Sequence, residues 1–220
     1  MPSTLARERR DDDRIRRPSS VPRPPPTQSR VPVPPTLTTR RLLLRPFTLD
    51  DAPAVQRLLS TWEAVRYTGS YPHPYPDGEA ERWIARQTAP MAEGTLLRLA
   101  VTARDDGTLL GSGELVLEPE QRRAELGYWI GGPYTGRGYA VETAHVLLRH
   151  AFGMMGLHRV QARVFVENAP SAAVLRRVGM RCEARLRAHG WRWNVLHDVD
   201  CYGILAGESP VSTTTTGENG

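Results

Sequence analysis

Hydrophobic and polar residues alternate along the segment RRAELGYWI, which ends at Ile130. The alternation gives an apolar row and a mixed row: Ala124, Leu126, Tyr128 and Ile130 against Glu125, Gly127 and Trp129. A period of two residues is typical of a half-buried strand. This segment is therefore predicted to be a strand with two differently occupied faces.

The hydrophobic period changes directly after this strand. From Tyr139 to Met155 apolar residues recur at helical spacing: Val141, Ala144, Leu148, Phe152 and Met155. The β-rich segment RVQARVFV follows a short GLH turn and predicts a second strand. The segment from Asn168 to Val178 predicts a short helix that ends at Gly179. The order is strand, loop, helix, strand, turn and helix.

The upstream segments predict further elements of the same domain. The expected elements are a strand over 40–45, a helix over 49–60, a helix over 79–91, and a hairpin of strands 96–103 and 109–117. Together with the downstream half, this pattern predicts an α/β domain in which strands and helices are mixed along the chain.

The loop Thr135-Gly136-Arg137-Gly138-Tyr139-Ala140 joins the first strand to its helix. Glycines let a ligand approach the backbone closely, and a helix start offers unpaired N–H groups and a positive dipole end. The loop therefore predicts a cradle for a diphosphate.

Several segments in this order resemble the GNAT acyltransferases, and in particular the RimJ/RimL-like ribosomal-protein-alanine N-acetyltransferase type. The matching text is AELGYWI, GRGYAVETAHVLLRHAF, GLHRVQARVFVENAPSAAVLRRVGM and HDVDCYGIL, with RRLLLRPFTLDDAPAV upstream. The resemblance covers roughly residues 37–206. It implies a mostly antiparallel central sheet that splays at the cofactor site, with helices on both faces, and acetyl-CoA as co-substrate without a metal.

The composition indicates one domain over 37–207 between two tails. Residues 1–36 carry eight arginines against four acidic residues and many prolines, and we expect them to be disordered. This tail supplies most of the formal charge of +5, so nucleic-acid binding is expected only as weak contacts of the tail. Residues 208–220 are expected to be a flexible tail. No apolar run is long enough to span a membrane, and Cys182 and Cys201 are expected to be free thiols in a cytoplasmic protein.

Transfer of an acetyl group to an amine needs a base, and Glu125 is the first candidate because it lies on the strand that leads to the loop. Gly127 leaves room beside it. Glu125 also matches a Glu position that is common in the family. The alternative is a strand glutamate paired with Arg122 or Arg123. His189 and His197, near the last strands, are further candidates for the base.

The departing thiolate benefits from a proton donor, which many family members supply as a tyrosine on the last helix. That position here is Leu175, so the chain departs from this pattern. The RimL-like variant has a serine after the asparagine, which makes Ser171 the candidate acid; its alternative role is to cap the helix. Asn168 is predicted to cap the same helix, to bind the pantetheine arm, or both.

The resemblance implies that acetyl-CoA is held mainly by backbone groups of the loop and of the splayed strands. The predicted cofactor contacts are Trp129, Ile130, Thr135, Gly136, Arg137, Gly138, Tyr139, Ala140 and Asn168. The Arg137 guanidinium could add a contact to phosphate. Thr135 stands where the family prefers Gln or Arg, so this site lacks that side chain.

Acceptor contacts are expected from the aromatic loop YTGSYPHPYPDG and from the last strands: Tyr71, His73, Tyr75 and His189. The alternative for the loop is simple packing of its aromatics on the sheet. The expected reaction is direct transfer to a primary amine, either a protein N-terminus or a small molecule. A silent domain that binds acyl-CoA as a sensor or scaffold is the competing function. The chain is expected to be a monomer or a homodimer.

Overall fold

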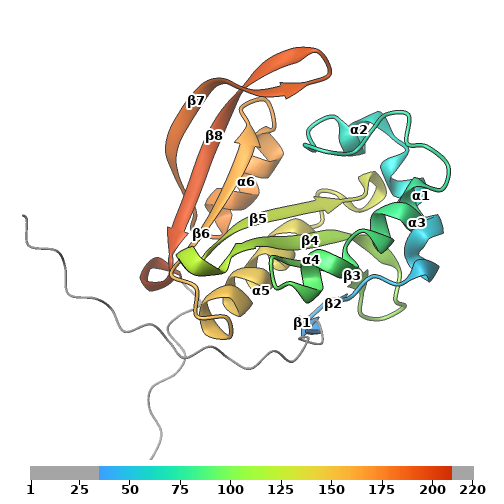
Figure 1. The fold of residues 1–220 in the computed structure, drawn as a ribbon, viewed down its shortest axis with the longest axis horizontal. Helices are drawn as coiled ribbons and strands as arrows, with labels where there is room; N and C mark the ends of the chain where they lie inside the picture. Colours follow the sequence, from blue (N-terminus) through green and yellow to red (C-terminus); the bar gives the residue numbers. More distant parts are fainter. Residues whose placement is uncertain (1–34, 210–220) are drawn as a thin grey trace, which may run out of the picture. The chain divides into compact units, whose positions relative to one another are not determined.

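A computed structural model describes residues 35–209 of the chain (Figure 1). The expectations of a disordered tail over 1–36 and a flexible tail over 208–220 fall almost wholly outside these residues. Within the described part, Ala206–Glu208 forms a short 3₁₀ helix after the last strand.

Eight strands form one sheet in the order β1-β2-β3-β4-β5-β6-β8-β7. Their bounds are Leu37–Thr38 (β1), Leu42–Arg45 (β2), Leu96–Ala103 (β3), Leu109–Glu118 (β4), Arg123–Ile130 (β5), Arg159–Phe165 (β6), Arg181–Arg192 (β7) and Val195–Leu205 (β8). Every neighbouring pair is antiparallel except β5 and β6, which are parallel. The predicted mixed, mostly antiparallel sheet is confirmed.

The parallel pair of β5 and β6 is short. Its register runs from Arg123 opposite Arg159 to Glu125 opposite Gln161 and ends there. Each strand stays paired along its other edge, β5 with β4 and β6 with β8. The two strands therefore separate beyond Glu125, and their facing edges carry backbone groups with no strand partner.

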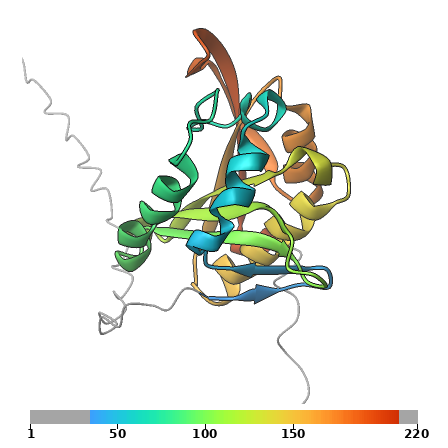
Figure 2. The ribbon, with the colours of Figure 1, turned by 90° about the vertical axis from the view of Figure 1, so that its right-hand side faces the viewer.

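Helices cover both faces of the sheet (Figures 1 and 2). One face carries α1 (Ala52–Leu59), α2 (Trp62–Val65), α3 (Glu79–Ala85) and α4 (Thr88–Ala92); the other carries α5 (Tyr139–Gly153) and α6 (Ala169–Arg177). Two separate apolar clusters fill these layers. Leu126 belongs to the cluster under α5, whereas Trp129 belongs to the cluster under α1 and α3. The predicted division of this strand into two faces is therefore confirmed.

Two helices are shorter than the sequence pattern predicted, and prolines account for both differences. The expected helix over 49–60 is a 3₁₀ helix, Leu49–Asp51, followed by α1, which begins next to Pro53. The expected helix over 79–91 is divided into α3 and α4. Pro90 has no N–H to donate to the carbonyl of Arg86, four residues earlier, so a continuous helix would lose that bond.

Helix α5 packs very closely on the sheet at Gly113 of β4. A Cβ atom at this position would lie 2.6 Å from Thr143 Cγ2 and 2.9 Å from Leu147 Cδ1. Gly113→Ala should therefore lower the free energy of unfolding by about 1–3 kcal/mol through overpacking. Gly153→Ala is the matched control, since a Cβ there meets nothing within 4 Å, and it should be neutral or slightly stabilising. Urea unfolding of both variants tests this, and equal midpoints would contradict it.

No helix within residues 35–209 combines the length and the apolar character that crossing a membrane requires. Both cysteines are free thiols, as expected, with Cys182 exposed and Cys201 half-buried.

Candidate active site

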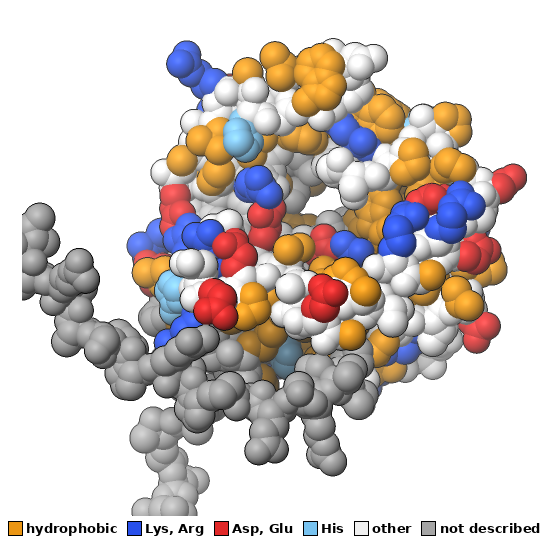
Figure 3. All heavy atoms as spheres, viewed as in Figure 1, with side chains coloured by type: hydrophobic (Ala, Val, Ile, Leu, Met, Phe, Trp, Pro, Cys, Tyr) orange, Lys and Arg blue, Asp and Glu red, His pale blue; other side chains and the backbone are white. Residues whose placement is uncertain are grey.

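The gap between β5 and β6 opens a cleft of about 890 Å³. Its walls include the separated ends of both strands, from Leu126 to Ile130 and from Ala162 to Phe165. Figure 3 shows the surface hollowed below the tip of the β7–β8 hairpin, on the side of α2. Side chains from both faces of the sheet line this cleft, so it connects the layer of α1 to α4 with the layer of α5 and α6.

Glu125 lies at the point where β5 and β6 part, and its carboxylate lines the cleft. The alternative to a catalytic role predicted that Glu125 pairs with Arg122 or Arg123, and it pairs with neither. Its partner is Arg163 of β6, whose Nε lies 3.0 and 3.1 Å from the two carboxylate oxygens. A carboxylate offers about four lone-pair sites, so this pairing leaves Glu125 able to accept a further proton or hydrogen bond.

A second carboxylate, Glu114 of β4, lies beside Glu125 on the same wall. It is directly opposite Gly127, and a Cβ at Gly127 would lie only 2.6 Å from Glu114 Oε1. Arg98 of β3 forms an ion pair with Glu114. The room predicted at Gly127 is thus filled by this second carboxylate, which the sequence analysis did not identify.

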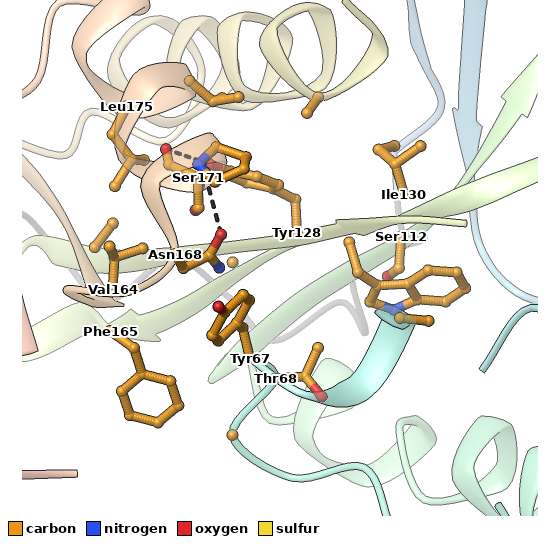
Figure 4. Close-up of a pocket in the computed structure, with 18 of the residues that line it drawn as sticks. Tyr67, Thr68, Ser112, Tyr128, Ile130, Val164, Phe165, Asn168, Ser171 and Leu175 are labelled. Carbon is orange, nitrogen blue, oxygen red and sulfur yellow. Dashed lines mark hydrogen bonds between the residues drawn. The ribbon is translucent and has the colours of Figure 1, made fainter. Parts of the chain in front are cut away.

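Tyr128 and Ser171 lie on the opposite side of the cleft from these carboxylates. The two hydroxyl oxygens are 2.9 Å apart, and the Tyr128 hydroxyl also donates to the Ser171 carbonyl oxygen at 3.2 Å (Figure 4). Asn168 caps α6 as predicted, because its Oδ1 accepts from the Ser171 N–H at 3.2 Å. Burial raises the pKa of Tyr128 to about 12. Leu175, also on α6, adds an apolar surface to the same wall.

The predicted loop follows β5 and leads into α5. Gly136 and Gly138 have φ angles of 74° and 83°, which favour glycine, and Gly138 is the N-cap of α5. The N–H groups of the first turn of α5 have no intrahelical acceptor. Thr135 and the residues from Gly138 to Ala140 line the cleft. The cleft thus offers unpaired backbone groups of β5 and β6 at one end and the N-terminus of α5 at the other. This arrangement fits an elongated ligand that carries both amides and a diphosphate, such as acetyl-CoA.

Arg137 differs from the other loop residues because it does not line the main cleft; it lines a second hollow, beside α5. Its carbonyl accepts from Arg41 NH1 at 3.0 Å. Arg41 also pairs with Glu142 of α5 at 2.7 Å and lies over the Tyr139 ring. Burial alone would raise the pKa of Glu142, but hydrogen bonds from Thr39 and Arg41 lower it. These contacts hold the loop on the side away from the cleft, and they come from Thr39 and Arg41 in the turn between β1 and β2.

The aromatic loop divides between the cleft and the core. Tyr67 and Tyr71 line the cleft, and the Tyr71 hydroxyl accepts from Trp129 Nε1 at 3.1 Å. Burial raises the pKa of Tyr71. Tyr75 is buried among apolar side chains and His73 stacks edge-on against Trp62 at 5.5 Å, and neither is among the residues that line the cleft. Of the three predicted loop residues, only Tyr71 lines the cleft, so the prediction of an acceptor contact is kept for Tyr71 alone.

The β7–β8 hairpin closes one end of the cleft. His189 lines the cleft, whereas His197 does not and lies 3.3 Å from Glu167. At the tip, Trp193 Nε1 donates to the Arg66 carbonyl at 3.0 Å, and its ring lies 4.8 Å from that of Trp62. The tip of the hairpin is thus held against α2 and the residue that follows it by a hydrogen bond and a ring contact. Trp129 was predicted as a cofactor contact. Its indole packs in the layer of α1 and α3, where it donates to Tyr71, and is not directed at the glycine loop before α5.

Within residues 35–209, no group of three His, Cys, Asp or Glu side chains is arranged to hold a metal ion. The site described above supplies the carboxylates of Glu114 and Glu125, the hydroxyls of Tyr128 and Ser171, backbone N–H groups and a helix N-terminus. The arrangement can take a proton on one side of the cleft and donate hydrogen bonds on the other.

Comparison with known proteins agrees with this geometry. A family model described as "Acetyltransferase (GNAT) domain" matches residues 41–181. The N-acetyltransferase YoaA of Bacillus subtilis is 31% identical over 172 residues, which cover 78% of this chain and 97% of YoaA.

Two solved structures are similar as well. Mycobacterium smegmatis RimJ in complex with CoA-disulfide superposes with a TM-score of 0.73 and 27% identity, over 80% of this chain and 90% of that one. A GNAT-family acetyltransferase from Bacillus anthracis gives a TM-score of 0.71 and 25% identity, over 79% of this chain and 99% of that one. The chain therefore belongs to the GNAT family and is an N-acetyltransferase that uses acetyl-CoA, with RimJ-type enzymes among its relatives.

Proposed function

We propose that the enzyme acetylates a primary α-amine, at a protein N-terminus or on a small molecule, by direct attack on acetyl-CoA. The observation that carries the proposal is the division of the cleft. Glu125 lies on the wall of α1 to α4, and Ser171 lies on the wall of α5 and α6. An amine that enters from the first side and a thioester that lies along the second would meet in the gap of the sheet.

In this proposal Glu125 accepts the proton of the attacking amine, directly or through a water molecule. An α-amine has a pKa of about 8, so its neutralisation at pH 7 costs about 1.4 kcal/mol, compared with about 4.6 kcal/mol for lysine. The amine nitrogen bonds to the acetyl carbon. The N–H groups of β5 that lack a partner beyond Glu125 are available to the oxyanion. The bond from carbon to sulfur then breaks, and the Ser171 hydroxyl donates a hydrogen bond to the departing sulfur.

The residues that would hold acetyl-CoA follow the same division. The backbone from Gly136 to Ala140 and the first turn of α5 would bind the diphosphate. The separated edges of β5 and β6 would bind the pantetheine amides, with Ile130 and Asn168 on their walls. The Arg137 side chain would reach only a group outside the main cleft.

The charge of the cleft favours an acceptor with one amine over a polyamine. Three glutamates and three arginines line it: Glu63, Glu114, Glu125, Arg66, Arg98 and Arg163. Two of the glutamates are already paired with arginines. A polyamine would need several free carboxylates, since each ammonium group without one would lose its hydration in the cleft and gain no ion pair to offset that cost.

The test is acetyl-CoA consumption over a panel of amines, with products identified by mass spectrometry. We expect turnover of short peptides with a free N-terminus, none of the same peptides with a blocked N-terminus, and slower turnover of spermidine. Binding of acetyl-CoA without turnover of any amine would contradict the proposal and favour the role of a sensor.

A further inference from the structure

Tyr128 carries a partly buried hydroxyl in the wall of the cleft, and the reaction as described above does not use this hydroxyl. It lies on β5, three residues after Glu125, and its side chain crosses to α6. Its only hydrogen-bond partner among residues 35–209 is Ser171, through both the hydroxyl and the carbonyl oxygen. A phenol of a core strand is thus directed at the one serine of α6, in a place where Leu175 supplies no hydroxyl.

The directions of these hydrogen bonds follow from the atoms involved. A carbonyl oxygen can only accept, so the Tyr128 hydroxyl is the donor in the contact at 3.2 Å. The phenol has a single hydrogen, which can point at either of the two Ser171 oxygens. When it points at the Ser171 hydroxyl oxygen, the hydrogen of Ser171 is free to point into the cleft. A thiolate that forms there favours this arrangement, because hydrogen bonds to charged acceptors are stronger.

We propose that Tyr128 is a positioning residue that donates to Ser171 Oγ and thereby directs the Ser171 hydrogen at the departing sulfur. This inference rests on the proposed function, since it requires Ser171 to serve the leaving group. Two hydrogen bonds in line then stabilise the electron pair that the sulfur keeps when the bond to carbon breaks. The chain of donors runs from β5 through α6 to the cleft.

The phenol keeps its proton throughout this step. Its pKa of about 12 lies well above that of an ordinary thiol, about 8.5, so full transfer to the thiolate would be uphill. The amine proton goes to Glu125 and then to solvent, and the sulfur takes its proton from solvent after release. The charges and atoms of amine, acetyl-CoA, amide and CoA are then balanced without any change in Tyr128.

The test compares Tyr128→Phe, Ser171→Ala and the double variant on an amine that the wild type acetylates. Tyr128→Phe should lower kcat about tenfold or more and leave the Kd of acetyl-CoA within about twofold. The loss should be the same from pH 7 to pH 10, because the phenol is protonated throughout. The double variant should be no slower than Ser171→Ala, since Tyr128 acts through Ser171.

Tyr202→Phe is the matched control. Tyr202 is a buried tyrosine of β8 outside the cleft, and its hydroxyl accepts from Arg176 at 3.0 Å. This variant should lose stability but keep its kcat. The inference is overturned if Tyr128→Phe keeps the wild-type kcat, if its loss multiplies with that of Ser171→Ala, or if Tyr202→Phe slows the reaction equally. A wild type that acetylates no amine overturns the proposed function and this inference together, whereas the other outcomes overturn the inference alone.

Discussion

Gly138→Val should abolish measurable binding of acetyl-CoA. Gly138 has a φ of 83° and is the N-cap of α5, so its backbone sets the direction of the N–H groups at the helix start. A β-branched residue resists this conformation by about 1–3 kcal/mol. A Cβ would also lie 3.4 Å from Arg41 NH2, the side chain that fixes the loop from behind. The loop should therefore change shape where we propose that it binds the diphosphate.

Differential scanning fluorimetry and calorimetry with acetyl-CoA measure this effect. The wild type should gain about 2.7 kcal/mol of stability when acetyl-CoA is at 100 times its Kd. Gly138→Val should gain nothing. Gly94→Val is the control, because Gly94 has a φ of 70°, meets nothing within 4 Å and lies outside the cleft. It should lose stability from the same strain and still bind. Tight binding by Gly138→Val would show that the loop does not hold the diphosphate.

The elements around the cleft could be predicted because their signals are local. Alternation over RRAELGYWI, the glycines before α5 and the Asn168 cap each involve residues within a few positions, and the structure has the strand, the loop and the cap. The two faces of β5 follow from the same alternation. A period of two residues needs no knowledge of distant partners.

The partners of the site residues could not be predicted in the same way. Arg163 is 38 positions from Glu125, and Ser171 is 43 positions from Tyr128. These contacts depend on where β5 and β6 part and on the register of three pairs between them. Glu114 is opposite Gly127 only in the register of β4 with β5. The apolar row of the strand also made Tyr128 indistinguishable from a core residue.

The aromatic loop shows the same limit. Tyr71 and Tyr75 are four residues apart and both are buried, yet only Tyr71 reaches the cleft. The difference arises from tertiary packing: Trp129 donates to the Tyr71 hydroxyl, whereas Tyr75 packs among the helices of that layer. Residue type alone therefore identified the loop but not which of its tyrosines lines the cleft.

Glu125→Gln should lower kcat about 100-fold or more near neutral pH, with little change in the Kd of acetyl-CoA. Glutamine keeps the shape of the side chain and can still accept from Arg163 through Oε1, so the contact between β5 and β6 is retained in part. What it loses is the ability to take a proton. The loss should shrink toward pH 10, because an α-amine with a pKa of about 8 is then already neutral. Rates on one peptide from pH 6.5 to pH 10 measure this.

Two further variants decide whether the effect belongs to Glu125. Glu183→Gln is the control: Glu183 also pairs with an arginine across strands, Arg159 at 3.0 Å, but it lies outside the cleft and should keep the wild-type kcat. Glu114→Gln is the competing candidate, since Glu114 shares the wall with Glu125. A loss that shrinks with pH in Glu114→Gln and is missing in Glu125→Gln would assign the base to Glu114. If all three variants keep the wild-type kcat, His189 or water is left as the group that takes the proton.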